Sequence, residues 1–233
     1  MLLMASVEQS MRQLVEEPRD TVYIVEDEDD ARALYYAVVR SMGLGCETFG
    51  CATEFLERCD ALRPGCLVLD LVLPDVSGIA LQRELTLRGI TIPIIFVTNK
   101  GQVANAVEAM RQGAFNFLEK SFSNLELMDN IRQAVALDHN QRRTASQIDA
   151  IRARLGSLTE REHDVLIEVL SGRPNKIIAH RLNLNLRTIE LHRSRVMEKM
   201  GADSVPELVR MIIRVDRGQY GSSADHSGGL HEE

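Results

Sequence analysis

The sequence predicts an α/β domain built on a parallel sheet, followed by a second, smaller all-α domain. Between residues 21 and 138, short runs of β-branched and aliphatic residues alternate five times with segments of helical periodicity. This alternation is typical of a parallel sheet with helices on both faces. From residue 158 onward, segments of helical periodicity follow one another directly. A chain of 233 residues is long enough for both domains.

The elements of the first domain are bounded by hydrophobic runs and by residues that interrupt regular structure. The segment Cys66–Asp70 is a continuous apolar run that ends in one carboxylate, which is the pattern of a strand buried on both faces. Pro74 and Gly78 then prevent regular structure from continuing. The predicted strands are 21–25, 46–49, 66–70, 92–97 and 116–119, and the predicted helices are 30–42, 52–62, 79–87, 103–111 and 125–137.

Polar side chains stand at the ends of four of these strands. Glu26 and Asp27 follow the first strand, and Asp70 ends the third. Thr98 ends the fourth strand, and Lys120 follows the fifth. The carboxyl ends of parallel strands meet at one edge, where open α/β sheets bind ligands. An aspartate in such a place is, by itself, equally typical of the start of a turn, but the other polar strand ends favour a binding site.

The residues expected at this edge suit phosphoryl transfer to a carboxylate. Three carboxylates provide the oxygen ligands that Mg²⁺ prefers. Lys120 adds a fixed positive charge, and Thr98 adds a hydroxyl donor. Asp70 lies on the central strand and is therefore the best-placed nucleophile, while Mg²⁺ and Lys120 would stabilise the charge on the transferring group.

The second domain, residues 158–217, has the pattern of a helix-turn-helix. Thr159 and Glu162 form a capping box that begins the first helix, which ends at Gly172. A short helix over 175–182, a tight turn, and a longer helix from Asn185 to Met200 follow. A fourth helix begins at Ser204. This domain carries 11 Lys and Arg against 9 Asp and Glu, whereas residues 1–157 carry 16 against 22. The contrast favours nucleic-acid binding by the second domain.

The remaining segments join or flank the two domains. Residues 139–157 are predicted to be a linker that continues the preceding helix in part, residues 1–20 an N-terminal extension, and residues 218–233 a disordered tail. No apolar stretch is long enough to span a membrane, and the N-terminus lacks the basic region of a signal peptide. The four cysteines lack metal-ligand spacing and contain no CxxC pair, so we expect reduced thiols and a cytoplasmic protein.

Residues 20–138 resemble the receiver domain of bacterial two-component response regulators. The resemblance rests on Val25-Glu26-Asp27, on Asp70 with Pro74 and Gly78, and on Thr98 and Lys120. It implies a doubly wound (βα)5 flavodoxin-like fold and a phosphoryl group accepted by Asp70 from a sensor histidine kinase. It also implies a magnesium site and a conformational switch. The implied metal ligands are Glu26, Asp27, Asp70 and the Val72 carbonyl, and the implied switch residues are Thr98 and Phe117.

The sequence departs from the receiver pattern at two places. The family usually has proline after the lysine, in a cis peptide, and Ser121 stands there in this chain. Small residues are common after the switch threonine, but Asn99 and Lys100 follow Thr98.

Residues 156–217 resemble the LuxR-type DNA-binding domain, and the two domains together resemble the FixJ/NarL-type transcription regulators. The resemblance rests on Thr159-Glu160-Arg161-Glu162, Asn175-Lys176, Ala179, Thr188, Glu190, His192 and Lys199. It implies that Glu190, Leu191 and Ser194 face base edges in the major groove. It implies phosphate contacts for Lys176, Thr188, His192, Arg195 and Lys199, and a dimer surface on the fourth helix formed by Val205, Leu208, Val209 and Ile212.

These observations predict a response regulator that binds promoter DNA as a dimer when Asp70 is phosphorylated. The expected partners are a sensor histidine kinase, double-stranded promoter DNA, RNA polymerase and a second copy of the chain, with no membrane. An alternative is a regulator that binds DNA without phosphate control and uses its receiver for protein interaction. We expect no enzyme beyond assisted self-phosphorylation and slow self-dephosphorylation, because no second nucleophile or base accompanies Asp70.

Overall fold

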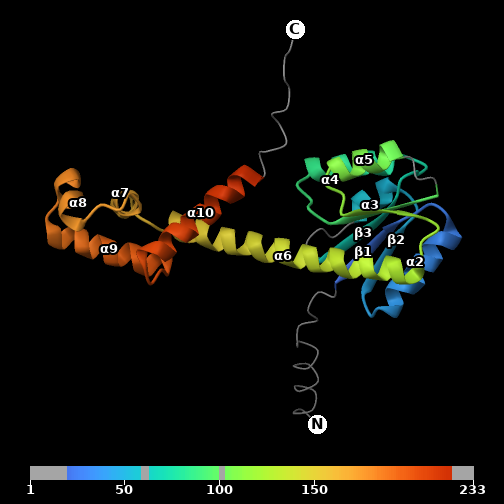
Figure 1. Cartoon of the computed structure of the whole chain (residues 1–233), viewed down its shortest axis with the longest axis horizontal. Coiled ribbons are helices and arrows are strands. Elements are labelled where there is room, and N and C mark those ends of the chain that lie inside the picture. The colour runs from blue at the N-terminus through green and yellow to red at the C-terminus, as the bar shows by residue number, and fades with distance from the viewer. Residues whose placement is uncertain (1–19, 59–62, 100–102, 222–233) are drawn as a thin grey trace, which may run out of the picture. The chain divides into compact units, whose positions relative to one another are not determined.

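A computed structural model describes residues 20–58, 63–99 and 103–221 (Figure 1). The chain divides into two compact units with the boundary between Arg142 and Arg143, and each unit is described by itself. The predicted N-terminal extension, the end of the predicted helix over 52–62, Lys100 and the end of the predicted tail lie outside the described residues. Within the described part of the chain, no helix is both long and apolar enough to cross a membrane.

The first unit is the predicted doubly wound α/β domain. Its described residues form one parallel five-stranded sheet in the order β2-β1-β3-β4-β5, which is the flavodoxin-like order. The order reverses between β1 and β3, so a crevice for ligands is expected at the carboxyl ends of these two strands. The strands are β1 (Thr21–Val25), β2 (Gly45–Phe49), β3 (Gly65–Asp70), β4 (Ile94–Thr98) and β5 (Asn116–Glu119).

Helices cover both faces of this sheet, as the alternating pattern predicted. One face packs against α3, α4 and α5 around Phe55, Leu81 and Phe96, and the other packs against α2 and α6 around Ile24 and Ile131. The central strand β3 is buried along its whole length, which explains its continuous apolar sequence. The helices are α2 (Asp29–Ser41), α3 (Ala52–Arg58), α4 (Gly78–Leu87), α5 (Val103–Arg111) and α6 (Asn124–Gly156).

Three elements depart clearly from the predicted boundaries. Helix α10 (Val205–Gly221) includes residues 218–221, which were predicted to belong to a disordered tail. Strand β4 begins at Ile94, two residues later than expected, because Pro93 has no N–H to donate to a neighbouring strand. Helix α6 is 33 residues long and runs through the segment predicted to be a linker. Asp138, just before this segment, is buried and accepts hydrogen bonds from Gly65 N at 2.9 Å and, at 2.7 Å, from Nε of Arg142, which lies within the segment. The segment therefore takes part in packing.

The second unit is helical and contains the predicted helix-turn-helix. The capping box of Thr159 and Glu162 is present, and Asn183 adopts the left-handed conformation that ends the short helix α8. Ile151 from the end of α6 is buried in the core of this unit, as is Leu208, so Leu208 does not lie on an exposed face of its helix. The helices are α7 (Glu160–Leu170), α8 (Asn175–Leu182), α9 (Leu186–Met200) and α10 (Val205–Gly221).

Candidate functional site

The sheet brings the predicted polar residues to one edge. Strands β1 and β3 are hydrogen-bonded neighbours, with Val25 opposite Leu69. The residues that follow in each strand, Glu26 and Asp70, therefore lie side by side at the carboxyl edge. The backbone N–H of Lys120 donates to the Thr98 carbonyl at 2.8 Å, which fixes the start of the loop after β5 beside the end of β4.

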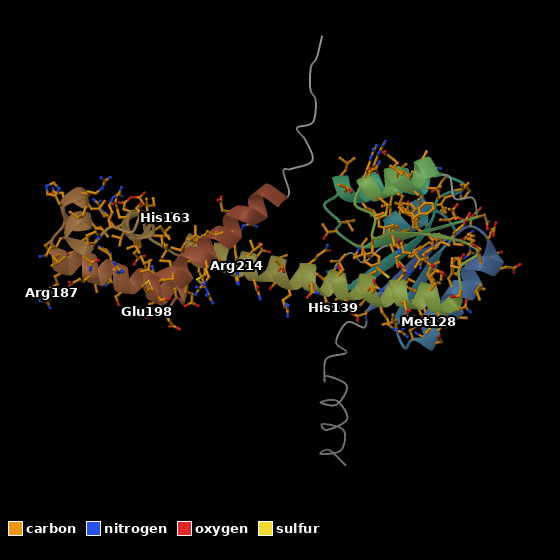
Figure 2. The ribbon with its side chains drawn as sticks, viewed as in Figure 1. Met128, His139, His163, Arg187, Glu198 and Arg214 are labelled. Atoms are coloured by element: carbon orange, nitrogen blue, oxygen red, sulfur yellow. The ribbon has the colours of Figure 1, made fainter. Side chains whose placement is uncertain are left out.

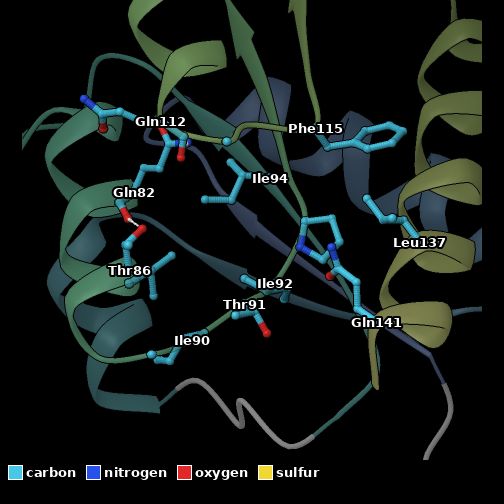
Figure 3. A pocket seen from close by; sticks show the side chains of 14 residues that line it. Gln82, Thr86, Ile90, Thr91, Ile92, Ile94, Gln112, Phe115, Leu137 and Gln141 are labelled. Carbon is cyan, nitrogen blue, oxygen red and sulfur yellow. Dashed lines mark hydrogen bonds between the residues drawn. The ribbon is translucent and has the colours of Figure 1, made fainter. Parts of the chain in front are cut away.

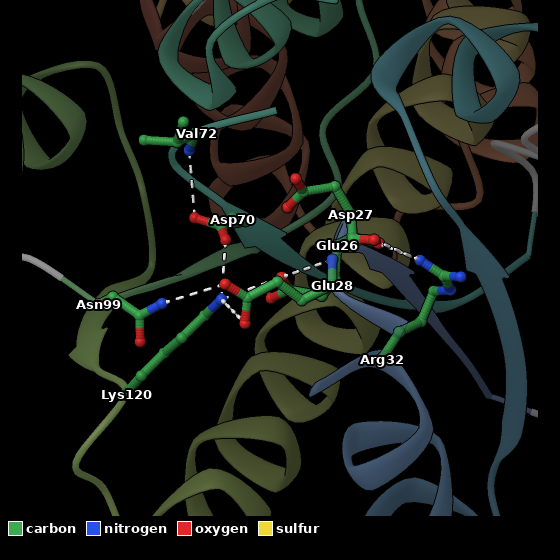
Figure 4. Close-up of polar contacts among 8 residues, drawn as sticks. All are labelled: Glu26, Asp27, Glu28, Arg32, Asp70, Val72, Asn99 and Lys120. Carbon is green, nitrogen blue, oxygen red and sulfur yellow. Dashed lines mark hydrogen bonds and ion pairs between the residues drawn. The ribbon is translucent and has the colours of Figure 1, made fainter. Parts of the chain in front are cut away.

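Lys120 joins the two buried carboxylates of the site (Figure 4). Its Nζ lies 2.9 Å from Oε1 of Glu26 and 2.9 Å from Oδ2 of Asp70. A third carboxylate oxygen, Oε2 of Glu28, lies farther away, 3.7 Å from Lys120 Nζ. Asp70 is only 6% exposed and Glu26 only 1% exposed, so these hydrogen bonds are shielded from water. The arrangement places one ammonium group where negative charge on a group bound to Asp70 would need it.

The carboxylates of Glu26, Asp27 and Asp70 form a cluster that could hold a cation. One oxygen of each lies within 4.8 Å of the others. Oε2 of Glu26 is buried and accepts no hydrogen bond from any residue within the described ranges, so its lone pairs are available to a metal ion. Oxygen-only donors with high negative charge fit Mg²⁺. The cluster therefore fits the predicted ion, whereas the predicted role of the Val72 carbonyl stays a prediction.

The electrostatics of the cluster also favour a bound cation. Burial raises the pKa of Glu26 from 4.5 to about 7; the hydrogen bond from Lys120 opposes this rise, and the negative charge of Asp70 adds to it. Burial alone would lower the pKa of Lys120, but its hydrogen bonds to Asp70 and Glu26 raise it above its ordinary value. Lys120 is therefore a permanent cation, and the second positive charge of a metal ion would favour the ionised form of Glu26.

Three local features hold the loops around the site in place. Arg32 Nη1 donates two hydrogen bonds, one to the Glu26 carbonyl at 2.6 Å and one to the Asp27 carbonyl at 3.2 Å. A Cβ at Gly78 would lie 2.3 Å from the Asp70 carbonyl oxygen, so only glycine fits there. At the predicted departure after Thr98, Asn99 Nδ2 donates to Glu28 Oε1 at 3.4 Å across the site.

The two predicted switch residues occupy neighbouring strands. Thr98 is buried at the end of β4, and Phe117 is half-buried on β5 with its ring centroid 6.2 Å from that of Phe96. The backbone register pairs Phe117 with Phe96 and Thr98 with Glu119. The two residues are thus close enough for a displacement of Thr98 to affect the packing around Phe117, but their role as a switch stays a prediction.

A separate pocket of about 220 Å³ lies near the opposite edge of the same sheet (Figure 3). It is lined by the ends of α4 and α5, by the segment that leads into β4, and by Leu137 and Gln141 of α6. Its lining side chains include the amides of Gln82 and Gln112 but no charged group. Phosphoryl chemistry needs charged groups, so the site of interest is the Lys120 cluster and not this pocket.

The second unit carries the predicted DNA-contact residues on α8 and α9. Figure 2 shows side chains along the whole of α9, with Arg187 near its start and Glu198 near its end. The residues expected to read bases are all exposed, as are two of those expected to contact phosphates. The base-reading set is Glu190, Leu191 and Ser194, and the two exposed phosphate contacts are Lys176 and Arg195. These roles stay predictions.

The other three predicted phosphate contacts are less exposed. Thr188 donates its hydroxyl to Oδ1 of Asn185 at 2.9 Å, as part of the cap of α9. Nδ1 of His192 is buried without a hydrogen-bond partner among the described residues. Lys199 donates to Oε2 of Glu162 at 2.6 Å and to the Ser157 carbonyl at 3.0 Å, so its ammonium is already occupied within the unit.

Comparisons with known proteins agree with this arrangement. The response regulator receiver domain family matches residues 22–132, and the luxR family of bacterial regulatory proteins matches residues 156–212. The chain is 42% identical over 205 residues to the transcriptional regulatory protein FixJ of Rhizobium meliloti, which covers 87% of this chain and 98% of that protein. It is 38% identical over 204 residues to the response regulator protein TmoT of Ectopseudomonas mendocina, with 88% and 93% covered. The low-resolution structure of the response regulator StyR matches with a TM-score of 0.77 at 37% identity and covers 84% of this chain and 99% of that chain.

Proposed function

Because this chain belongs to the two-component response regulators that carry a receiver domain and a LuxR-type DNA-binding domain, we propose that it accepts a phosphoryl group on Asp70 from the histidine of a sensor kinase. The observation that carries the proposal is the position of Lys120 Nζ, 2.9 Å from the Asp70 carboxylate in a buried cluster. A bond from an Asp70 oxygen to phosphorus forms while the bond from phosphorus to the imidazole nitrogen of the donor breaks.

The residues of the cluster have different roles in this transfer. Glu26, Asp27 and Asp70, with the Val72 carbonyl, would hold Mg²⁺. The ion supplies positive charge that neutralises the oxygens of the transferring group. Lys120 supplies a second, permanent positive charge at the Asp70 carboxylate. The chain thus acts as a phosphoacceptor, and we expect from it only assisted self-phosphorylation and slow self-dephosphorylation.

Phosphorylation then acts through Thr98 and Phe117. A phosphoryl group on Asp70 attracts the Thr98 hydroxyl through a charge-assisted hydrogen bond. The space that Thr98 leaves can be filled by an inward turn of the half-buried Phe117, which repacks the face formed by α5, β5 and the start of α6. Phosphate stabilises one of two states by binding it better, so this is a population shift.

The altered receiver face pairs two copies of the chain and so controls transcription. A dimer places two recognition helices, α9, at half-sites about one DNA turn apart on the promoter, where RNA polymerase is recruited or blocked. Phosphate control distinguishes this proposal from the alternative, in which the second unit binds DNA irrespective of Asp70.

Phosphate control can be tested by titrating one operator fragment with three samples: the resting chain, the chain treated with acetyl phosphate and Mg²⁺, and the treated Asp70→Asn variant. The phosphorylated chain should bind tightly and sediment as a dimer, while the other two samples should bind weakly and remain monomeric. Equal binding by all three would favour the alternative.

A further inference from the structure

Helix α3 begins without a cap of its own. The residue before Ala52 is Cys51, which is not one of the side chains that cap helices well. The first N–H groups of a helix need acceptors, because the helix itself provides none. A carboxylate from a distant part of the chain meets this need at α3.

That carboxylate is Asp75, more than 20 residues further along the chain. Its Oδ2 accepts a hydrogen bond from Thr53 N at 2.8 Å and another from Thr53 Oγ1 at 2.7 Å. Its Oδ1 accepts a bond from Ala52 N at 3.2 Å and one from Val76 N at 2.9 Å. Burial would raise the pKa of Asp75, but these hydrogen bonds hold it well below its usual range, so the side chain is an anion at the positive end of α3.

Asp75 lies in the middle of the loop that leaves the phosphoacceptor strand. One end of this loop is fixed by the bond from Val72 N to Asp70 Oδ1 at 3.1 Å. The other end is fixed by the bond from Gly78 N to the Leu71 carbonyl at 2.9 Å. The side chain of Val72 is 68% exposed, so its own burial contributes little to holding the loop. The side chains of Leu71 and Leu73, on either side of Val72, are buried in the core, and the hydrogen bonds of Asp75 tie the part of the loop beyond them to α3.

We propose that Asp75 is a positioning residue for the metal site, which it serves by fixing the loop that carries Val72 to the start of α3. The proposal deepens the proposed function, in which Asp70 and the Val72 carbonyl hold Mg²⁺. Without the Asp75 anchor, the loop samples more positions, and the free energy of binding the ion must include the loss of that freedom. Residues that orient metal ligands typically change metal affinity by about 10- to 100-fold when they are removed.

The test compares variants for Mg²⁺ binding and for phosphorylation. Calorimetric titration of the full chain with Mg²⁺ gives the affinity without any phosphoryl transfer. The initial rate of labelling by acetyl phosphate, measured across a range of Mg²⁺ concentrations, gives a half-saturating concentration and a plateau. Asp75→Ala should weaken Mg²⁺ binding by about tenfold and shift half-saturation equally, with a plateau close to that of the wild type. Asp75→Asn keeps one acceptor oxygen, so its Mg²⁺ affinity should lie between those of the wild type and Asp75→Ala.

The control is Glu54→Ala, which removes the same charge from the first turn of α3 but has no bond to the loop of Asp75. It should leave Mg²⁺ affinity unchanged. If Asp75→Ala is too unstable to titrate, Thr53→Ala offers a milder variant, because it removes only the hydrogen bond from the Thr53 hydroxyl to Asp75. It should lose Mg²⁺ affinity, but by less than tenfold. Wild-type affinity in Asp75→Asn and Thr53→Ala would overturn the proposal. Unlabelled Asp70 in a wild-type chain that binds Mg²⁺ would instead contradict the proposed function and leave the calorimetric comparison valid.

Discussion

The ammonium of Lys199 donates a hydrogen bond of 2.6 Å to Oε2 of Glu162, although the two residues are 37 positions apart in the chain. Glu162 is also the second member of the capping box that begins α7. One carboxylate thus joins the last turn of α9 to the first turn of α7. Glu162 is 3% exposed, so the ion pair is shielded from water on the side of the acid.

This ion pair gives Lys199 a structural role, and the role predicts the effect of its removal. Lys199→Ala should destabilise the second unit, because it leaves a buried carboxylate without its cation. It should leave the dependence of DNA affinity on salt nearly unchanged, whereas Arg195→Ala should lower the slope by about one unit. Urea unfolding and binding at several salt concentrations measure both. A lower salt slope with unchanged stability in Lys199→Ala would instead support the predicted phosphate contact.

Glu162 also predicts a pH dependence of stability. The hydrogen bond from Lys199 and that from the Thr159 backbone lower the pKa of Glu162 from 4.5 to about 2. The folded second unit therefore gains stability from the ionised form at pH values above about 4.5, and loses it as the pH falls toward about 2. In urea unfolding over this pH range, Glu162→Gln should show a flatter stability curve than the wild type. Glu160→Gln, an exposed neighbour, serves as the control and should follow the wild type.

Glu26 predicts a pH dependence of opposite sign at the metal site. Its pKa is raised by burial to about 7, so a proton and Mg²⁺ compete for the carboxylate near neutral pH. Affinity for Mg²⁺ should fall as the pH drops through about 7. In metal-free protein the contribution of Glu26 to stability falls as the pH rises from about 4.5 to about 7, because the folded state holds the proton more tightly. Glu26→Gln should bind Mg²⁺ more weakly and lose this pH dependence in calorimetric titrations; an unchanged pH profile would contradict the assignment.

Exposed residues of α8 and α9 should affect DNA binding in two different ways, some through sequence preference and others through overall affinity. Glu190 can accept from the amino group of cytosine, so Glu190→Ala should cost about 1–3 kcal/mol on the preferred site and relax the preference there. Lys176→Ala should weaken binding to all sequences alike. Competition binding with operator variants measures both effects. The assignments would be wrong if Lys176→Ala changed the preferred sequence and Glu190→Ala did not.

The sequence was most informative where one local signal determines one element. The continuous apolar run that ends at Asp70 predicted a central buried strand, and the structure confirms it. The cap at Asn185 and the glycine at 201 bound helix α9 as predicted. The polar strand ends predicted a common edge, because parallel strands share the direction in which they end, and Glu26, Asp70 and Lys120 do meet there.

The sequence was least informative where a residue bonds to, or packs against, a residue far away in the chain. The segment 139–157 has few apolar residues and was predicted to be a linker, yet Asp138 just before it is bonded to β3 and Ile151 within it is buried in the second unit. Its apolar pattern is thin because the helix is covered at its two ends by different cores. The bonds of Asp75 to α3 and of Lys199 to α7 leave no local pattern at all.

The most direct test of the central claim is the intact mass of the chain after incubation with acetyl phosphate and Mg²⁺. The wild-type chain should gain one phosphoryl group, in a linkage stable to acid and labile to base, and Asp70→Asn should gain none. Lys120→Ala, which removes the ammonium 2.9 Å from Asp70, should be labelled much more slowly. Full labelling of Asp70→Asn in the same linkage would contradict the account, because the phosphoryl group would then reside on another residue.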